Sequence, residues 1–223
     1  MSPPDQTNRA RPRALIFDWD NTLVDSWPVI REALNATLVE FGQSPWSMVE
    51  TRQRVRKSTR DSFPALFGDD WERAGVFFYA RYEEIHADKI APIPDAEEML
   101  EQVGSLGFYL AVVSNKRGDF LRAEAHQLGW DRYFSTLVGA TDAAEDKPAR
   151  APVDMALKGS AIAAGGDVWF IGDADIDLQC AQNANCTGIL IGDGEQDPDS
   201  PFQAPADIQF PNCKALCNFL DKL

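Results

Sequence analysis

Short apolar segments alternate with amphipathic helical segments along most of this 223-residue chain, and this alternation restricts the fold more than any other feature. The segments expected to form strands are 14–17, 109–113, 135–138, 168–171, 188–191 and 207–210. Expected helices lie between or after them at 95–106, 119–128, 152–163, 175–184 and 213–223. Several strand segments are apolar almost throughout, which is typical of strands covered on both faces. The pattern therefore predicts an α/β fold with a Rossmann-like parallel sheet and right-handed crossovers.

The segment 26–91 interrupts this alternation, because only helical patterns occur in it. The helices expected there cover 28–41, 48–57, 60–67 and 70–89. Ser26 is expected to be the N-cap of the first of them, and Gly42 is expected to end it. Pro92 and Pro94 mark the return to the alternating pattern. We therefore predict a disordered leader at 1–12, an α/β catalytic core at 13–25 plus 92–223, and an inserted all-helical cap domain at 26–91.

The formal net charge is −14, and 44% of the residues are hydrophobic, as in an ordinary soluble globular protein. This charge argues against nucleic acid and against anionic membranes as partners, because both repel an acidic surface. No stretch approaches the roughly 20 apolar residues that a membrane span needs, and residues 1–13 lack the apolar region of a secretory signal. We expect a cytoplasmic protein, and these features predict no particular oligomeric state.

The four cysteines all lie in the last quarter of the chain, at Cys180, Cys186, Cys213 and Cys217. With no secretory signal in front of them, they are expected to be reduced thiols in a cytosolic protein. A zinc site is the weaker alternative, because no Cys-x-x-Cys pair exists and both His86 and His126 are far away in sequence.

Two aspartates, Asp18 and Asp20, come directly after the first strand segment at 14–17. Alternation along an extended chain puts both on the same side, roughly 6–7 Å apart at the backbone. Two carboxylates at the end of a hydrophobic strand repel each other and lose solvation, so they need a cation or a function. A metal-dependent site is therefore predicted at this position.

Three further polar groups follow strand segments or precede a helix: Ser114-Asn115-Lys116, Asp146-Lys147-Pro148, and Gly172-Asp173 with Asp175 and Asp177 close behind. The carboxyl ends of parallel strands meet at one edge of the sheet, so we expect these groups to share one site. Carboxylate oxygens that leave room for water and phosphate suit Mg²⁺ better than zinc or a caged calcium. A carboxylate, a metal and a lysine in one pocket can carry phosphoryl transfer through an aspartyl-phosphate.

Each of these motifs has an ordinary structural interpretation when it stands alone. Asp18 and Asp20 could close a strand as exposed turn residues, and Ser114 could begin a turn. Lys147 could be a solvated surface lysine, and Asp173 could begin a helix whose first-turn acids favour the helix dipole. All four motifs in this order favour the shared site.

The four motifs together resemble those of the haloacid dehalogenase superfamily, particularly its phosphoglycolate-phosphatase-like branch, which has a helical cap after the first strand. The stretches that carry the resemblance are Asp18-Trp19-Asp20-Asn21-Thr22-Leu23-Val24-Asp25-Ser26, Ser114-Asn115-Lys116, Lys147-Pro148 and Gly172-Asp173-Ala174-Asp175-Ile176-Asp177. The resemblance implies a Mg²⁺-dependent phosphatase that acts on a small phosphorylated metabolite. It also implies as the alternative a phosphosugar mutase similar to beta-phosphoglucomutase, whereas a dehalogenase or a non-catalytic binding protein is disfavoured by the intact acidic set.

The same resemblance implies a role for each matching residue. Asp18 is the nucleophile, and Asp20 is the acid and base that protonates the leaving oxygen and later activates water. Ser114 binds the transferring phosphoryl group and Lys147 offsets its charge. The implied Mg²⁺ ligands are Asp18, Asp173 and the carbonyl of Asp20. Supporting positions around these groups are Asp177 and Asn115.

Three positions depart from the commonest family pattern, and one cap segment is unusually basic. Asn21 replaces a frequent glycine, which the left-handed conformations open to Asn permit; Trp19 replaces a smaller residue, and Ala174 stands where Thr or Ser is frequent. Five of the ten residues at 51–60 are basic. Most are expected to be solvated, and the candidates for contact with an anionic leaving group are Lys57 and Arg60.

Overall fold

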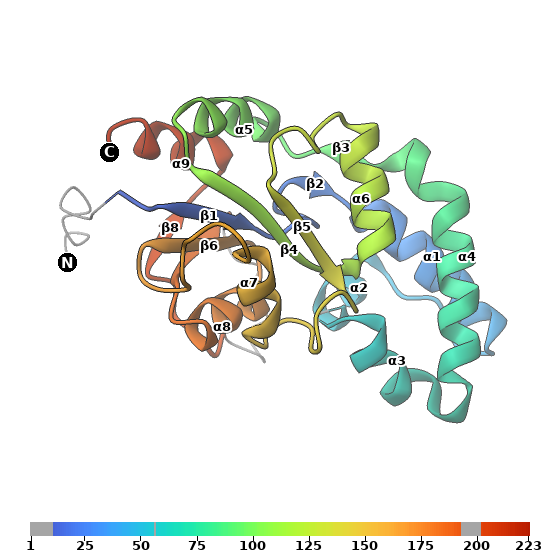
Figure 1. Cartoon of the computed structure of the whole chain (residues 1–223). Coiled ribbons are helices and arrows are strands. Elements are labelled where there is room, and N and C mark those ends of the chain that lie inside the picture. The colour runs from blue at the N-terminus through green and yellow to red at the C-terminus, as the bar shows by residue number, and fades with distance from the viewer. Residues whose placement is uncertain (1–10, 56, 193–201) are drawn as a thin grey trace, which may run out of the picture.

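The computed structural model describes residues 11–55, 57–192 and 202–223. In this part of the chain six parallel strands form one sheet in the order β5-β4-β1-β6-β7-β8 (Figure 1). The strands are β1 (Ala14–Phe17), β4 (Tyr109–Arg117), β5 (Thr136–Ala140), β6 (Val168–Gly172), β7 (Thr187–Ile191) and β8 (Ile208–Phe210). This is a doubly wound order: β4 and β5 are added on one side of β1 and β6, β7 and β8 on the other, so the switch point lies between β1 and β6. The predicted α/β class with a Rossmann-like parallel sheet is confirmed.

Helices cover both faces of the sheet, which is why the central strands are apolar throughout. The helices of this layer are α5 (Ala96–Ser105), α6 (Gly118–Gln127), α7 (Ala151–Ala156), α8 (Asp175–Asn183) and α9 (Cys213–Leu220). Leu15 and Phe17 of β1 pack in the core under α5, α6 and α9. Ala14 and Ile16 pack in the core under α7 and α8. Alternate residues of one buried strand thus serve two cores.

A helical insert lies between β1 and β4 in sequence and occupies the right side of Figure 1. It consists of α1 (Trp27–Glu40), α2 (Met48–Arg54), α3 (Thr59–Phe67), the short 3-10 helix η2 (Gly68–Asp70) and α4 (Trp71–Lys89). These helices share a hydrophobic core that includes Leu34, Leu38, Phe63 and Phe78. The chain enters through β2 (Val24–Asp25) and leaves through β3 (Ala91–Pro92), which pair antiparallel. A separate core favours the predicted cap domain, whose boundaries at 26 and 91 stay a prediction.

Four expected element ends are wrong by three residues or more. The terminal helix predicted at 213–223 ends at Leu220. The helix predicted at 152–163 ends at Ala156, because the turns that follow include Gly159 with a φ of 87°. The helix predicted at 48–57 ends at Arg54, where Val55 takes an extended conformation. Strand β4 continues to Arg117 with an irregular register, so the second motif lies within the strand and does not follow it.

Three other expectations concern the leader, membrane-spanning helices and the cysteines. Most of the predicted leader at 1–12 lies outside the described residues. Among the residues that are described, no helix combines the length and apolar character needed to cross a membrane. The four cysteines are free thiols with buried side chains, and burial raises the pKa of Cys180 to about 12.

Candidate active site

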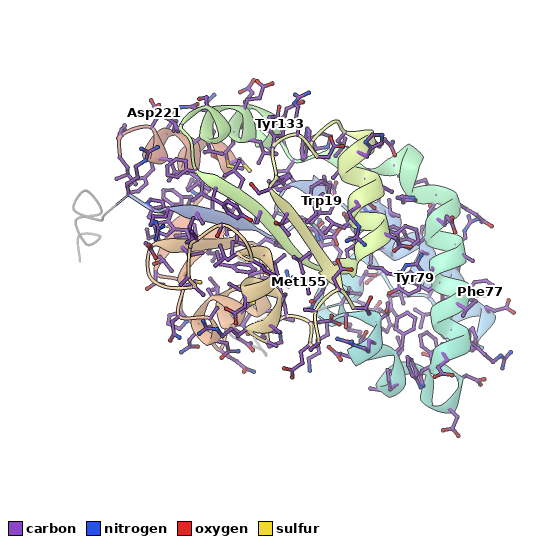
Figure 2. All side chains as sticks on the ribbon, viewed as in Figure 1. Trp19, Phe77, Tyr79, Tyr133, Met155 and Asp221 are labelled. Carbon is purple, nitrogen blue, oxygen red and sulfur yellow. The ribbon has the colours of Figure 1, made fainter. Side chains whose placement is uncertain are left out.

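The carboxyl end of β1 places the first two predicted site residues. The backbone N–H of Asp18 donates to the carbonyl oxygen of Ile171 at 2.8 Å, so the contact between β1 and β6 extends one residue past β1. Asp18 and Asp20 both line the cavity at this edge, whereas Trp19 between them is fully buried (Figure 2). Asn21 has a φ of 62°, which confirms the left-handed conformation expected for it.

Lys147 reaches the same edge from the loop between β5 and α7. Its ammonium lies 2.5 Å from Asp18 Oδ1 and 2.7 Å from Asp177 Oδ1, and its side chain is almost fully buried. Asn115 holds the backbone of this lysine from β4, because its Oδ1 accepts from the Lys147 N–H at 2.9 Å and its Nδ2 donates to the Lys147 carbonyl at 3.1 Å. The lysine is therefore fixed at its backbone and at its ammonium.

Three carboxylates converge on this lysine, and one ammonium does not balance them. One oxygen each of Asp18, Asp173 and Asp177 lies within 4.8 Å of the others. Burial, together with the charges of Asp177 and Asp20 and against the opposing charge of Lys147, raises the pKa of Asp18 to about 7. Burial and the neighbouring acids also raise the pKa of Asp173 well above its ordinary value. The cluster carries excess negative charge, which a cation would offset.

The donor set fits a divalent cation with a preference for oxygen. Carboxylate oxygens at this spacing are ligands of the kind that Mg²⁺ takes, with room for water and phosphate on the open side. The three candidate ligands are Asp18, Asp173 and Asp177. The Asp20 carboxylate is not one of the three, and Asp177, for which the resemblance implies either a metal-site or a supporting role, belongs to the group.

A glycine at the end of β6 makes room for the Asp177 carboxylate. A Cβ atom added to Gly172 would lie 2.3 Å from that carboxyl carbon, closer than any real contact. The N–H of Ala174 donates to Asp177 Oδ2 at 3.1 Å, so this departure from the family pattern still supplies a backbone donor. Asp175 instead accepts from the N–H groups of residues 203 and 204 and supports that loop.

Asp20 lies beside this cluster with its own set of partners. Its Oδ1 accepts from the hydroxyl of Ser26 and from the ammonium of Lys116, the latter at 2.6 Å. Ser26 is the N-cap residue of α1, as expected, but its side chain contacts Asp20 and makes no capping hydrogen bond. Lys116 also lies 2.5 Å from Glu124 Oε2 on α6. Burial alone would lower the pKa of Lys116, but these carboxylates and Tyr82 raise it above its ordinary value.

No role is predicted from the sequence for Lys116 or Glu124, which both contact groups of this site. Lys116 was only the third residue of the second motif, and Glu124 was part of an ordinary helix. A signal was present, because Glu124 shares a helical face with Phe120 and Leu121, where an apolar residue is expected. A charged residue at a core position of a helix indicates a buried partner.

One cavity of about 160 Å³ between the sheet edge and the insert brings the predicted site residues together. Its lining includes Asp18, Asp20, Ser114, Asn115, Lys147, Asp173, Asp177 and Lys57. The insert and α6 supply an apolar and aromatic wall that contains Tyr79, which faces the sheet in Figure 2 while Phe77 points away. Arg60 is not part of this lining; it lies 2.8 Å from Asp146 Oδ2 and so joins α3 to the core.

The fold and this site define an α/β enzyme scaffold with an acidic centre at the switch point of its sheet. The chain belongs to the family of haloacid dehalogenase-like hydrolases, whose model matches residues 15–191. It is 30% identical over 194 residues to a phosphoglycolate phosphatase from Chromobacterium violaceum, covering 83% of this chain and 87% of that protein. A phosphoglycolate phosphatase from Xanthomonas campestris is also 30% identical, over 88% of this chain and 91% of its own.

Solved structures give the same fold. A haloacid dehalogenase-like family protein from Streptococcus pneumoniae superposes with a TM-score of 0.82, covers 93% of this chain and 98% of its own, and is 20% identical. Identity at this level shows the fold alone. The resemblance deduced from the four motifs is confirmed by the family match.

Proposed function

We propose that this chain is a phosphatase that hydrolyses a small phosphomonoester through a phosphorylated Asp18. The observation that carries the proposal is the buried ammonium of Lys147 between the carboxylates of Asp18 and Asp177. An ammonium in contact with a carboxylate nucleophile reduces its repulsion from an incoming phosphate. The relatives from Chromobacterium violaceum and Xanthomonas campestris are named phosphoglycolate phosphatases, which supports hydrolysis over the mutase alternative.

The proposed reaction has two steps at phosphorus. In the first, a carboxylate oxygen of Asp18 forms a bond to phosphorus while the bond to the leaving oxygen breaks, and Asp20 donates a proton to that oxygen. In the second, Asp20 takes a proton from a water whose oxygen attacks phosphorus. The bond to Asp18 then breaks, which releases inorganic phosphate and restores both carboxyl groups. Ser114 donates a hydrogen bond to a phosphoryl oxygen throughout.

Mg²⁺ is the cation that we propose for the acidic cluster, held by Asp18, Asp173 and Asp177, with the Asp20 carbonyl as a further ligand. When bound, it supplies positive charge against the phosphoryl oxygens. Support comes from the excess of carboxylates over ammonium groups in the cluster and from their oxygen chemistry. Lys147 contributes a fixed share of the same charge.

We propose that the insert acts as a cap that encloses the leaving group. Lys57 lines the cavity and has no ion pair with any of the described residues, so its ammonium is available to an anionic leaving group. Arg60 is proposed for a different role from the one expected, because its guanidinium is already paired with Asp146 across the boundary between insert and core. The linkers β2 and β3 are the proposed hinges of the cap.

The test is release of inorganic phosphate from a panel of phosphorylated metabolites, phosphoglycolate among them, by purified protein with MgCl₂. We expect turnover with at least one of them, loss of turnover on chelation, and loss in Asp18→Asn. Asp154→Asn serves as the matched control, because that exposed carboxylate pairs with Arg150 at the surface. Turnover by Asp18→Asn at the wild-type rate would contradict the assigned nucleophile.

A further inference from the structure

Glu124 on α6 is a buried carboxylate with four polar partners and no part in the reaction described above. Its Oε2 accepts from the Trp19 ring N–H at 2.8 Å and lies 2.5 Å from the Lys116 ammonium. Its Oε1 accepts from the Tyr82 hydroxyl at 2.9 Å and lies 3.2 Å from His86 Nδ1. Only 1% of its side chain is exposed. A buried charge with this many partners has a precisely determined position.

The partners of Glu124 belong to two parts of the molecule. Trp19 and Lys116 belong to the core and lie next to Asp20 in sequence or in space. Tyr82 and His86 belong to α4 of the insert, one helical turn apart, and both rings pack against Phe120 of α6. The contact between α4 and α6 therefore contains a buried polar group. Oε2 of Glu124 contacts the two residues of the core, and Oε1 contacts the two residues of the insert.

Lys116 connects this junction to the site. Its ammonium lies between Glu124 Oε2 and Asp20 Oδ1, at 2.5 Å and 2.6 Å, and its side chain is 5% exposed. The position of the ammonium is thus set by both carboxylates together. Because Lys116 and Ser26 both contact Oδ1 of Asp20, Oδ2 is the oxygen left for the cavity that Asp20 lines.

We propose that Glu124 is a positioning residue for Asp20: through Lys116 it fixes which Asp20 oxygen faces the substrate, and the Tyr82 and His86 contacts complete this arrangement when the insert lies on the core. The inference rests on the proposed function, in which Asp20 is the acid and base. A buried ion pair is weak support for stability alone, since apolar residues of similar volume can replace one without loss. The proposed contribution of the Glu124–Lys116 pair is to fix the position of the Lys116 ammonium, and with it the orientation of the Asp20 carboxylate.

The test compares Glu124→Gln, which keeps the shape and removes the charge, in the wild-type and in the Asp20→Asn background. In the wild-type background we expect kcat to fall by about tenfold to a hundredfold with little change in KM, as for a misplaced catalytic group. In the Asp20→Asn background we expect no further fall, because the group that Glu124 positions is already gone. A purely structural role would lower activity equally in both backgrounds.

Tyr82→Phe is the second variant, since it keeps the ring and the fold and removes only the hydroxyl that donates to Glu124. We expect a smaller fall in kcat, about threefold to tenfold. The matched control is Tyr109→Phe, whose hydroxyl donates to the Ala156 carbonyl at 2.8 Å under the sheet; its kcat is expected to stay at the wild-type value.

The possible outcomes separate this inference from the proposed function. Normal kcat in both Glu124→Gln and Tyr82→Phe, or equal falls with and without Asp20, would overturn the positioning role while phosphatase activity stands. An inactive wild-type protein on the whole phosphomonoester panel would overturn both.

Discussion

Two buried lysines of this protein each lie between two carboxylates, but they belong to regions of different construction. Lys147 joins Asp18 and Asp177, and these partners come from the sheet edge and from the first turn of α8, both parts of the core. Lys116 joins Asp20 and Glu124, and Glu124 is completed by two side chains of the insert. The first region is formed by the core alone, whereas the second is complete only where insert and core meet.

The two halves of the proposed chemistry therefore depend on different parts of the chain. The nucleophile side is fixed by strands whose pairing is set by buried apolar residues. The acid and base side depends on the contact between α4 of the insert and α6 of the core, which are far apart in sequence. Variants that affect the two lysines should therefore differ in size of effect and in sensitivity to the insert.

The largest expected effect comes from Lys147→Met. Loss of the ammonium leaves Asp18 and Asp177 buried without their cationic partner, so we expect kcat to fall by about 10²–10³-fold. We also expect the free energy of unfolding to fall by about 3–5 kcal/mol. Phosphate release and urea unfolding measure the two effects. Lys158→Met is the control, because Lys158 is exposed on the surface.

Lys116→Met tests the second region, with an expected fall in kcat of about tenfold to a hundredfold. The fall is smaller because Asp20 retains its hydrogen bond from Ser26. If Lys116→Met lowers kcat as much as Lys147→Met does, the two regions do not differ in the way described here.

The pH dependence of stability is the next largest effect, and it belongs to the Lys147 region. The pKa of Asp18 is about 7 in the folded protein against an ordinary 3.8, so between these values the folded state holds a proton that the unfolded state has lost. Stability therefore falls as the pH rises from about 4 to about 7. Urea unfolding in EDTA should show this fall, and Asp18→Asn should reduce it.

A bound metal ion should offset the loss of stability that ionisation of the acidic cluster causes as the pH rises. Adding MgCl₂ should raise the free energy of unfolding more at pH 8 than at pH 5, because ionised carboxylates bind the cation. Stability in EDTA that rises from pH 5 to pH 8 would contradict the raised pKa of Asp18.

The smallest effects are expected at the two basic residues of the insert. Lys57→Gln should raise KM by about threefold to tenfold for a substrate with an anionic leaving group and leave KM for a neutral one nearly unchanged. Arg60→Gln should lower stability by about 1 kcal/mol or less, since 40% of its side chain is exposed, without this charge selectivity. Equal changes of KM for both substrates in Lys57→Gln would contradict a contact between Lys57 and the leaving group.

Most of the sheet could be predicted from the sequence, because a strand buried on both faces must be apolar throughout. The meeting of the four motifs at one edge of the sheet could also be predicted, because Asp18 and Asp173 directly follow two neighbouring parallel strands. Helix ends were less predictable: Gly159 takes a left-handed conformation that stops α7 earlier than its apolar pattern implies. The membership of Asp177 in the acidic cluster depends on the space left by Gly172, which no local pattern displays.

The second lysine region could not be predicted, for a physical reason. The position of Glu124 on the apolar face of α6 indicates a buried partner, but that this partner set includes Tyr82 and Lys116 follows only from the packing of α4 on α6 and of α6 on β4. Helical periodicity places Tyr82 on the packing face of its helix, and Tyr82 is buried there. The periodicity does not indicate which group the hydroxyl contacts. Tertiary contacts of this kind are carried by geometry that sequence spacing does not encode.

The pairing of β2 with β3 has a consequence for how proteins of this architecture can diversify. Because Val24 and Pro92 are directly opposite each other, the two points where the chain crosses into and out of the insert are adjacent. A segment of another length or shape with similarly close ends could be exchanged at this junction without altering any strand of the sheet. Such an exchange would leave the Lys147 region intact, whereas the Lys116 region would need a new partner for Glu124 in place of Tyr82 and His86.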